Sequence, residues 1–248
     1  MTKPLGFSLL EFILSLALSA ILILVATETY FSIQQTHQLQ TALAGIQETG
    51  RFVISTLDHR IRMAGADDCE KKKNWVNTED AIQGYSSDDL PTWLQGQVKA
   101  ETDVIVVGEC IQYQGIPQFT KTAYFIADTG RVNAQGESID ALYTKPMGGP
   151  RQELASDIEN MKIRYGVTSV DGKDVLAEKP AASISDWTKV RSVSIALLLN
   201  SEKAVLKTAS PYVFNGETFT EHGKWLHKEW DTYIFLRDLY TLDHPASS

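Results

Sequence analysis

The segment KPLGFSLLEFILSLALSAILILVA, residues 3–26, decides how this chain of 248 residues is organised. From residue 7 to residue 26 only three serines and Glu11 interrupt a continuous apolar run. A helix of that length spans about 30 Å, which is the thickness of the hydrocarbon core of a membrane. Lys3 precedes the run and no Lys or Arg follows until Arg51. This asymmetry predicts a single-pass membrane protein with a cytoplasmic N-terminus and the rest of the chain on the other side of the membrane.

A cleaved signal peptide is the alternative interpretation of the same segment. Lys3 would form its basic region, and cleavage would occur near Ala26. Glu11 argues against this interpretation, because the apolar part of a signal peptide seldom contains a carboxylate. The helical pattern also continues beyond the cleavage point, so we expect the segment to be retained.

A helical stripe continues from the apolar run into a polar stretch. Apolar residues recur at helical spacings, with Gly50 filling one step, at Leu39, Leu43, Ile46, Val53, Leu57 and Ile61. No proline occurs between Pro4 and Pro91, so the sequence predicts one helix over residues 7–64 with Gly65 as its C-terminal cap. We expect the stripe to be buried against a sheet, although its N-terminal half could also face neighbouring helices.

The remainder of the chain shows the alternating pattern of strands. Strands are expected at residues 103–109, 122–128, 160–168, 191–199 and 231–239, without long helices between them. This arrangement predicts an α+β fold in which the long N-terminal helix packs on an antiparallel β-sheet domain.

The chain contains two cysteines, Cys69 and Cys110. In an oxidising compartment they would form a disulfide that closes a loop of roughly 42 residues, worth about 4 kcal/mol in the loop-entropy model. Two buried free thiols are the alternative. Their spacing does not resemble a zinc site.

Composition and motifs argue against several classes of function. A net charge of −8 and a pI near 5.2 are unlike those of nucleic-acid-binding proteins. No phosphate-binding loop, dinucleotide fingerprint or nucleophile-elbow motif occurs. The five histidines lack the spacing of a metal site, and the acidic pairs at residues 67–68 and 88–89 are interpreted as loop residues rather than calcium ligands. We therefore predict no enzymatic activity, no cofactor and no metal.

Glu11 requires a partner, because an acidic group at mid-bilayer costs about 2.5–3.5 kcal/mol on insertion scales. Cleavage between Gly6 and Phe7 would create an α-amino group, whose ordinary pKa is about 8, one helical turn before Glu11. The partner would be either this new terminus or that of a neighbouring subunit. Glu11 is therefore the candidate assembly residue.

The stretch GFSLLE, residues 6–11, resembles the class III signal of type IV pilins and type II secretion pseudopilins. The resemblance implies that prepilin peptidase cleaves after Gly6 and N-methylates Phe7. Residues 39–70, which contain ETGRF, IRMAG and Cys69, resemble more narrowly the PilW family of minor pilins. Residues 157–167 and 187–199 resemble strands of that family and of the related pseudopilin J.

The resemblance implies a leader at residues 1–6, a transmembrane and filament-core helix at 7–28, an amphipathic continuation at 29–66 and a periplasmic β-rich domain at 67–248. It further implies a minor pilin of the PilW type that helps to initiate type IV pilus assembly within a priming or tip complex. Such a complex supports twitching motility, adhesion or DNA uptake. The expected partners are prepilin peptidase, other minor pilins, the major pilin and inner-membrane lipid, and the subunit would enter the pilus after assembly.

Two other functions fit the sequence. A J-type pseudopilin of type II secretion would assemble through the same kind of apolar helix, but in a secretion system rather than a pilus. A membrane-anchored periplasmic binding domain that never polymerises would instead keep its N-terminus and carry a pocket with converging polar groups.

Overall fold

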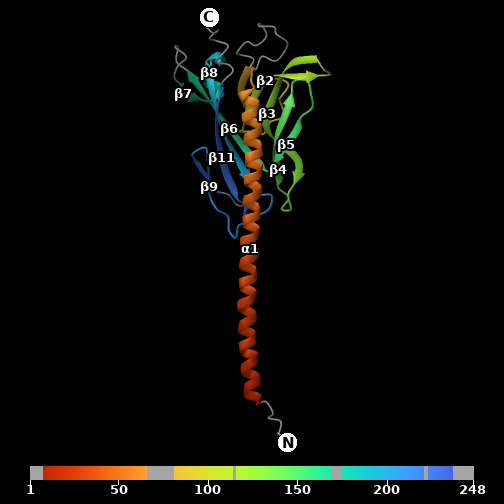
Figure 1. Cartoon of the computed structure of the whole chain (residues 1–248), viewed down its shortest axis with the longest axis vertical. Coiled ribbons are helices and arrows are strands. Elements are labelled where there is room, and N and C mark those ends of the chain that lie inside the picture. Colours follow the sequence, from red (N-terminus) through yellow and green to blue (C-terminus); the bar gives the residue numbers. More distant parts are fainter. Residues whose placement is uncertain (1–7, 66–80, 114–115, 169–174, 221–222, 237–248) are drawn as a thin grey trace.

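A computed structural model describes residues 8–65, 81–113, 116–168, 175–220 and 223–236. Helix α1 (Leu9–Arg62) is continuous over 54 residues and therefore about 81 Å long. Figure 1 shows its lower half projecting without any covering from a β-rich domain that surrounds its upper half. This confirms the predicted fold class. The helix ends two residues earlier than predicted, and Gly65 lies beyond it with a φ of 73°.

The described strands form two large antiparallel sheets and one hairpin. The first sheet has the order β1 (Ile82–Ser86), β2 (Asp103–Tyr113), β3 (Ile116–Val132), β4 (Ser138–Pro146) and β5 (Gln152–Ser156). The second has the order β11 (His227–Phe235), β8 (Val190–Asn200), β6 (Ile158–Thr168) and β7 (Val175–Lys179). The hairpin joins β9 (Tyr212–Phe214) and β10 (Glu217–Phe219), and two short 3-10 helices cover Ala181–Ser183 and Trp187–Lys189.

The division into two sheets differs from the single sheet that the sequence suggested. Asp157 is the only residue between β5 and β6, and its φ of 61° is unusual for a residue with a side chain. This turn takes the chain out of the first sheet, and its backbone N–H still donates to the Asp140 carbonyl at 2.9 Å. Because a positive φ at an aspartate is not visible in a sequence pattern, the break between the sheets was not predicted.

The helix and both sheets share one hydrophobic core. On α1 the buried residues are Ile46, Gly50, Val53, Leu57 and Ile61, spaced by three or four as one helical face requires. They contact the inner faces of both sheets, including Ile105 of β2 and Ile195 of β8. Leu39 and Leu43 are 38% and 36% exposed, so the domain covers the predicted stripe only from Ile46 onward.

A second, smaller cluster lies on the other face of the first sheet. Phe125 and Tyr143, whose rings stack with centroids 6.1 Å apart, are covered by the segment between β1 and β2 through Leu94 and Trp93. The first sheet is therefore buried on both faces, which explains why β2 and β3 read as nearly continuous apolar runs.

Candidate functional site

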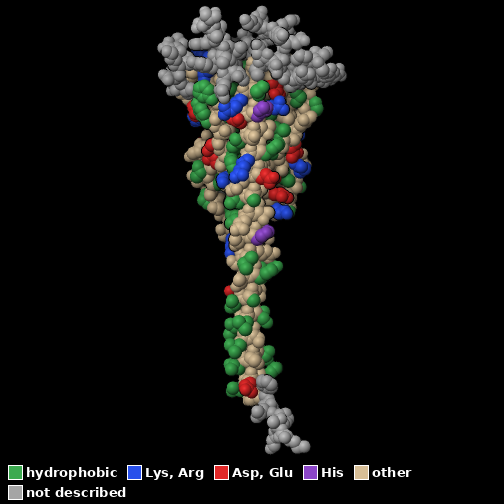
Figure 2. Space-filling view, in the orientation of Figure 1, with side chains coloured by type: hydrophobic (Ala, Val, Ile, Leu, Met, Phe, Trp, Pro, Cys, Tyr) green, Lys and Arg blue, Asp and Glu red, His purple; other side chains and the backbone are tan. Residues whose placement is uncertain are grey.

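The lower half of α1 presents an apolar surface that no other described residue of the chain covers. Its most hydropathic stretch has a mean hydropathy of 2.6 and is entirely unburied, and the helix is long and apolar enough to cross a membrane. Figure 2 shows this part of the rod covered by hydrophobic side chains, with acidic groups only near its ends. Leu9 is 78% exposed and Leu22 is 69% exposed. A soluble monomer rarely leaves a continuous apolar surface of this size in water.

Glu11 lies at the N-terminal end of this surface. Ser8 is the N-cap of α1, and its hydroxyl accepts a hydrogen bond from the Leu10 N–H at 3.4 Å. The Glu11 carboxylate in turn accepts from the Ser8 N–H at 3.1 Å, which completes a capping box. The carboxylate thus points back toward the start of the helix, where the helix dipole favours a negative charge.

Several predicted site residues lie outside the described part of the chain. Gly6 and Phe7 precede the first described residue, so the predicted cleavage and methylation site stays a prediction. Cys69 also lies outside the described residues, and of Cys110 only the backbone, in β2, is described. The disulfide is therefore not tested.

Polar contacts attach the upper end of α1 to β2, the strand that contains Cys110. The Arg60 guanidinium donates to the Glu109 carboxylate at 2.8 Å, and the Thr122 hydroxyl donates to the other Glu109 oxygen at 3.0 Å. Glu109 is 8% exposed, and its carboxylate raises the pKa of Arg60. The Gly65 N–H also donates to the Gly108 carbonyl at 3.0 Å. These contacts fix the direction of the rod relative to the domain.

A second attachment lies half-way along the domain, where the indole of Trp230 packs directly on the helix backbone at Gly50. A Cβ added at Gly50 would lie 2.7 Å from the indole, whereas one added at Gly45 would meet nothing within 4 Å. The close approach lets β11 lie against α1, as Figure 1 shows. Gly50 therefore permits packing that any larger residue would obstruct.

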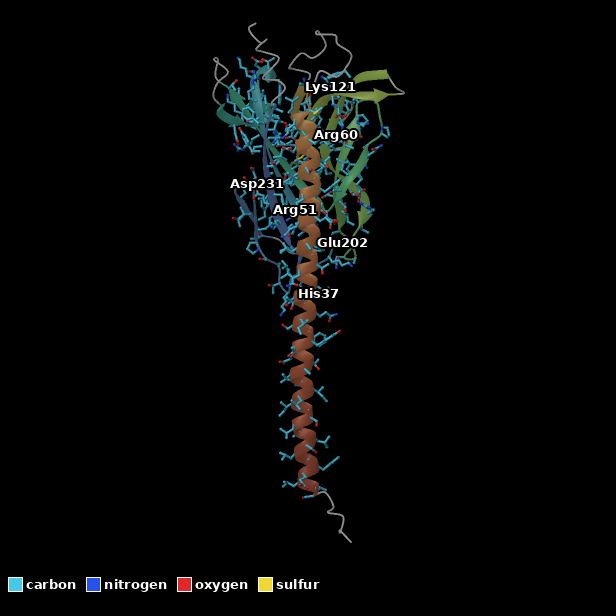
Figure 3. All side chains as sticks on the ribbon, in the orientation of Figure 1. His37, Arg51, Arg60, Lys121, Glu202 and Asp231 are labelled. Atoms are coloured by element: carbon cyan, nitrogen blue, oxygen red, sulfur yellow. The ribbon has the colours of Figure 1, made fainter. Side chains whose placement is uncertain are left out.

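A groove of about 670 Å³ lies where the domain ends along the helix. One wall comes from α1 between His37 and Thr49, and the other comes from Asp157 and the residues that follow β8, including Glu202. Figure 3 places His37 and Glu202 at this lower end, and Arg60 and Lys121 near the upper end. Burial raises the pKa of Asp157 above its ordinary range.

Sequence reasoning identified Glu11 but missed Ser8, which caps the helix and whose backbone N–H donates to the Glu11 carboxylate. The signal was present, because Ser8 and Glu11 have the spacing of a capping box immediately before an apolar run. The contacts of Arg60 with Glu109 and of Gly50 with Trp230 join residues far apart in the chain and leave no local pattern.

Comparison with known protein families gives a match to a family of pilus-assembly proteins. The family model described as type IV pilus-assembly protein W matches residues 123–242, which run from β3 through β11 and beyond. Searches of curated proteins and of solved structures return no match to the chain.

Proposed function

Because residues 123–242 match the family model of type IV pilus-assembly protein W, we propose that the chain is a minor pilin of the PilW family that helps to initiate the pilus. In this proposal prepilin peptidase removes residues 1–6 and N-methylates Phe7. The mature subunit waits in the inner membrane and then joins other minor pilins in a priming or tip complex, onto which the major pilin adds. Its work is structural, and the resulting fibre supports twitching motility, adhesion or DNA uptake.

The observation that carries this proposal is the bare apolar half of α1. Its side chains require either lipid or other apolar helices around them, because burial of apolar surface is worth about 25 cal/mol per Å². A membrane satisfies the requirement before assembly, and a bundle of identical or related helices satisfies it afterwards. The apolar surface of α1 therefore contacts lipid before assembly and neighbouring helices after it.

Glu11 distinguishes the assembled state from the membrane state in this proposal. Its carboxylate already points toward the helix start, where cleavage after Gly6 would place the new amine of Phe7 next to Ser8. Pairing with that amine, or with the amine of a neighbouring subunit, offsets the cost of placing the carboxylate in an apolar environment. Such a pair would set the axial register between subunits.

The test compares pilus number in cells that carry Glu11→Ala with pilus number in cells that carry Glu28→Ala. Glu28 is the other acidic residue in the apolar half of the same helix and is also exposed, so both variants lose one negative charge there. We expect Glu11→Ala to reduce the number of pili per cell severely and Glu28→Ala to change it little, at equal protein levels in the membrane. Normal pili in the Glu11→Ala strain would refute the register role.

The groove beside α1 supplies the converging polar groups that a non-polymerising binding domain would need. It is lined by His37, Asp157, Asn200 and Glu202. This second candidate requires an unprocessed N-terminus. Pilus counts in a strain lacking the protein separate the two, because an anchored binding domain would leave pilus number unchanged.

A further inference from the structure

The loop that follows β8, residues 201–207, reaches farther down α1 than the sheets do; we call it the basal loop. Ala204, Val205 and Leu206 face Phe31 and Gln34 of the helix across a shallow groove. Figure 1 shows this part of the chain in blue at the lower edge of the domain. The globular domain therefore comes close to the apolar half of the rod at this point.

The shape of the basal loop is fixed by hydrogen bonds. The backbone N–H groups of Val205 and Leu206 both donate to the Lys224 carbonyl, at 3.0 and 2.9 Å. The Ser201 hydroxyl donates to the Lys203 carbonyl at 2.7 Å and accepts from the Leu226 N–H at 3.0 Å. These bonds hold Lys203, Lys207 and Lys224 at one end of the domain, and all three side chains are exposed.

The position of the basal loop relative to a membrane follows from the helix. The apolar run ends at Ala26, and Phe31 lies five residues later, about 7.5 Å along the axis. The headgroup layer on each side of a bilayer is about 5–7 Å thick. Tyr30 and Phe31 are 63% and 62% exposed, and aromatic side chains are enriched at the membrane interface. Phe31, and the basal loop beside it, therefore lie at the outer edge of the headgroup layer.

Lysines outnumber acidic residues at this end of the domain. The basal loop contains Lys203, Lys207 and one acid, Glu202, so together with Lys224 it carries a net charge of +2 in a chain of net charge −8. Within the described part of the chain, neither these two lysines nor Lys224 forms a salt bridge. Figure 2 shows a basic side chain where the domain narrows to the bare helix. Three exposed ammonium groups are thus available to an anionic surface.

We propose that the basal loop and Lys224 bind the anionic phospholipid headgroups of the membrane in which α1 is anchored. Each Lys or Arg close to an anionic membrane strengthens such attachment about fivefold. The acidic remainder of the domain is repelled by the same surface, so the contact would hold the domain in one orientation before assembly. The inference rests on the membrane-anchored state of the proposed function and adds to it a specific lipid contact.

The test places the photoreactive amino acid benzoylphenylalanine in the full-length protein, reconstituted in nanodiscs. One set of nanodiscs contains phosphatidylcholine alone, and the other contains equal parts phosphatidylcholine and phosphatidylglycerol. The probe is placed at Leu206, with Thr208 as a second position in case the first variant does not fold. Met147 is the distal control, since it is exposed and its N–H donates to the carbonyl of Lys121 near the upper end. Lipid adducts are measured by mass spectrometry.

We expect several-fold more lipid adduct at Leu206 in discs that contain phosphatidylglycerol, and none at Met147 in either disc. Replacing Lys203, Lys207 and Lys224 by Gln should abolish the difference between the two lipids. Replacing Lys145, Lys179 and Lys189 by Gln removes as many charges away from the basal loop and should leave the difference intact. Equal adduct in both lipids, or no adduct at Leu206 and Thr208, would overturn the proposal.

A probe at Leu18 separates failure of this inference from failure of the proposed function. Leu18 lies in the middle of the apolar run and is 55% exposed. Lipid adduct at Leu18 without adduct at the basal loop would leave the anchored subunit intact and reject only the headgroup contact. Absence of adduct at Leu18 would reject the membrane-anchored state and this inference with it.

Discussion

Replacing Gly50 by Ala tests whether β11 packs on the helix as described. Alanine is a better helix former than glycine by about 0.8–1 kcal/mol, so an isolated helix would gain stability. The added Cβ at Gly50 would, however, lie 2.7–2.9 Å from three atoms of the Trp230 indole. That separation is shorter than normal van der Waals contact, and relieving it must move the ring or the strand that carries it.

Gly45→Ala is the matched control, since the same helix gains the same propensity and the new Cβ meets nothing within 4 Å. We expect Gly45→Ala to stabilise the protein by about 1 kcal/mol. Overpacking costs about 1–3 kcal/mol, so Gly50→Ala should be less stable than Gly45→Ala by about that amount. For a domain of this size the difference corresponds to roughly 2–12 °C in Tm.

Thermal unfolding of the full-length protein in detergent micelles, followed by circular dichroism, measures the difference. Combining Gly50→Ala with Trp230→Leu should remove most of the clash, so the effect of Gly50→Ala should then approach that of Gly45→Ala. If Gly50→Ala alone stabilises the protein as much as Gly45→Ala does, the indole does not lie on the helix and the described packing is wrong.

Three further substitutions test the core. Arg60→Ala leaves the buried Glu109 carboxylate without its cation and should cost about 1–3 kcal/mol in urea unfolding, with partial recovery on adding Glu109→Gln; an unchanged midpoint would contradict the contact. Burial raises the pKa of Asp103, so the folded state binds this proton more tightly than the unfolded chain, and the stabilisation from protonation is lost as pH rises through the raised pKa. The stability of the wild type relative to Asp103→Asn should therefore increase as pH falls from about 7 to about 4, and a constant difference would refute this. Gly84→Ala would place a Cβ against the fully buried ring of Tyr165 and should cost more than about 3 kcal/mol, measured as a loss of folded protein at 25 °C.

The long helix could be predicted because its signals are local and agree with one another. An apolar run, a continuing stripe and the absence of proline all extend over the same residues. The strands at β2, β3, β6, β8 and β11 were predicted for a similar reason, since each contains an alternating or continuous apolar core. The strands that were missed, such as β4 and β5, carry more polar residues, including the partly exposed Asp140 and the exposed Glu153.

The arrangement of these elements could not be read from local patterns. The change of sheet depends on the backbone at Asp157, and the close packing at Gly50 depends on an indole 180 residues later in the chain. Sequence reasoning gives Gly50 only one step of the apolar stripe, whereas the fold uses its missing side chain for close packing. Glu11 was found because a carboxylate in an apolar run is conspicuous. The lysines of the basal loop could not be singled out in the same way, because only the fold shows that they lie next to the apolar half of α1.

The intact mass of the protein extracted from native membranes tests the central claim most directly. The proposal that Glu11 pairs with a newly formed amine requires the mature chain to begin at Phe7. We predict a mass lower than that of the full chain by residues 1–6 and higher by one methyl group. A mature protein that still begins at Met1 would contradict the account, because the amine would then form six residues too early in the chain to pair with Glu11.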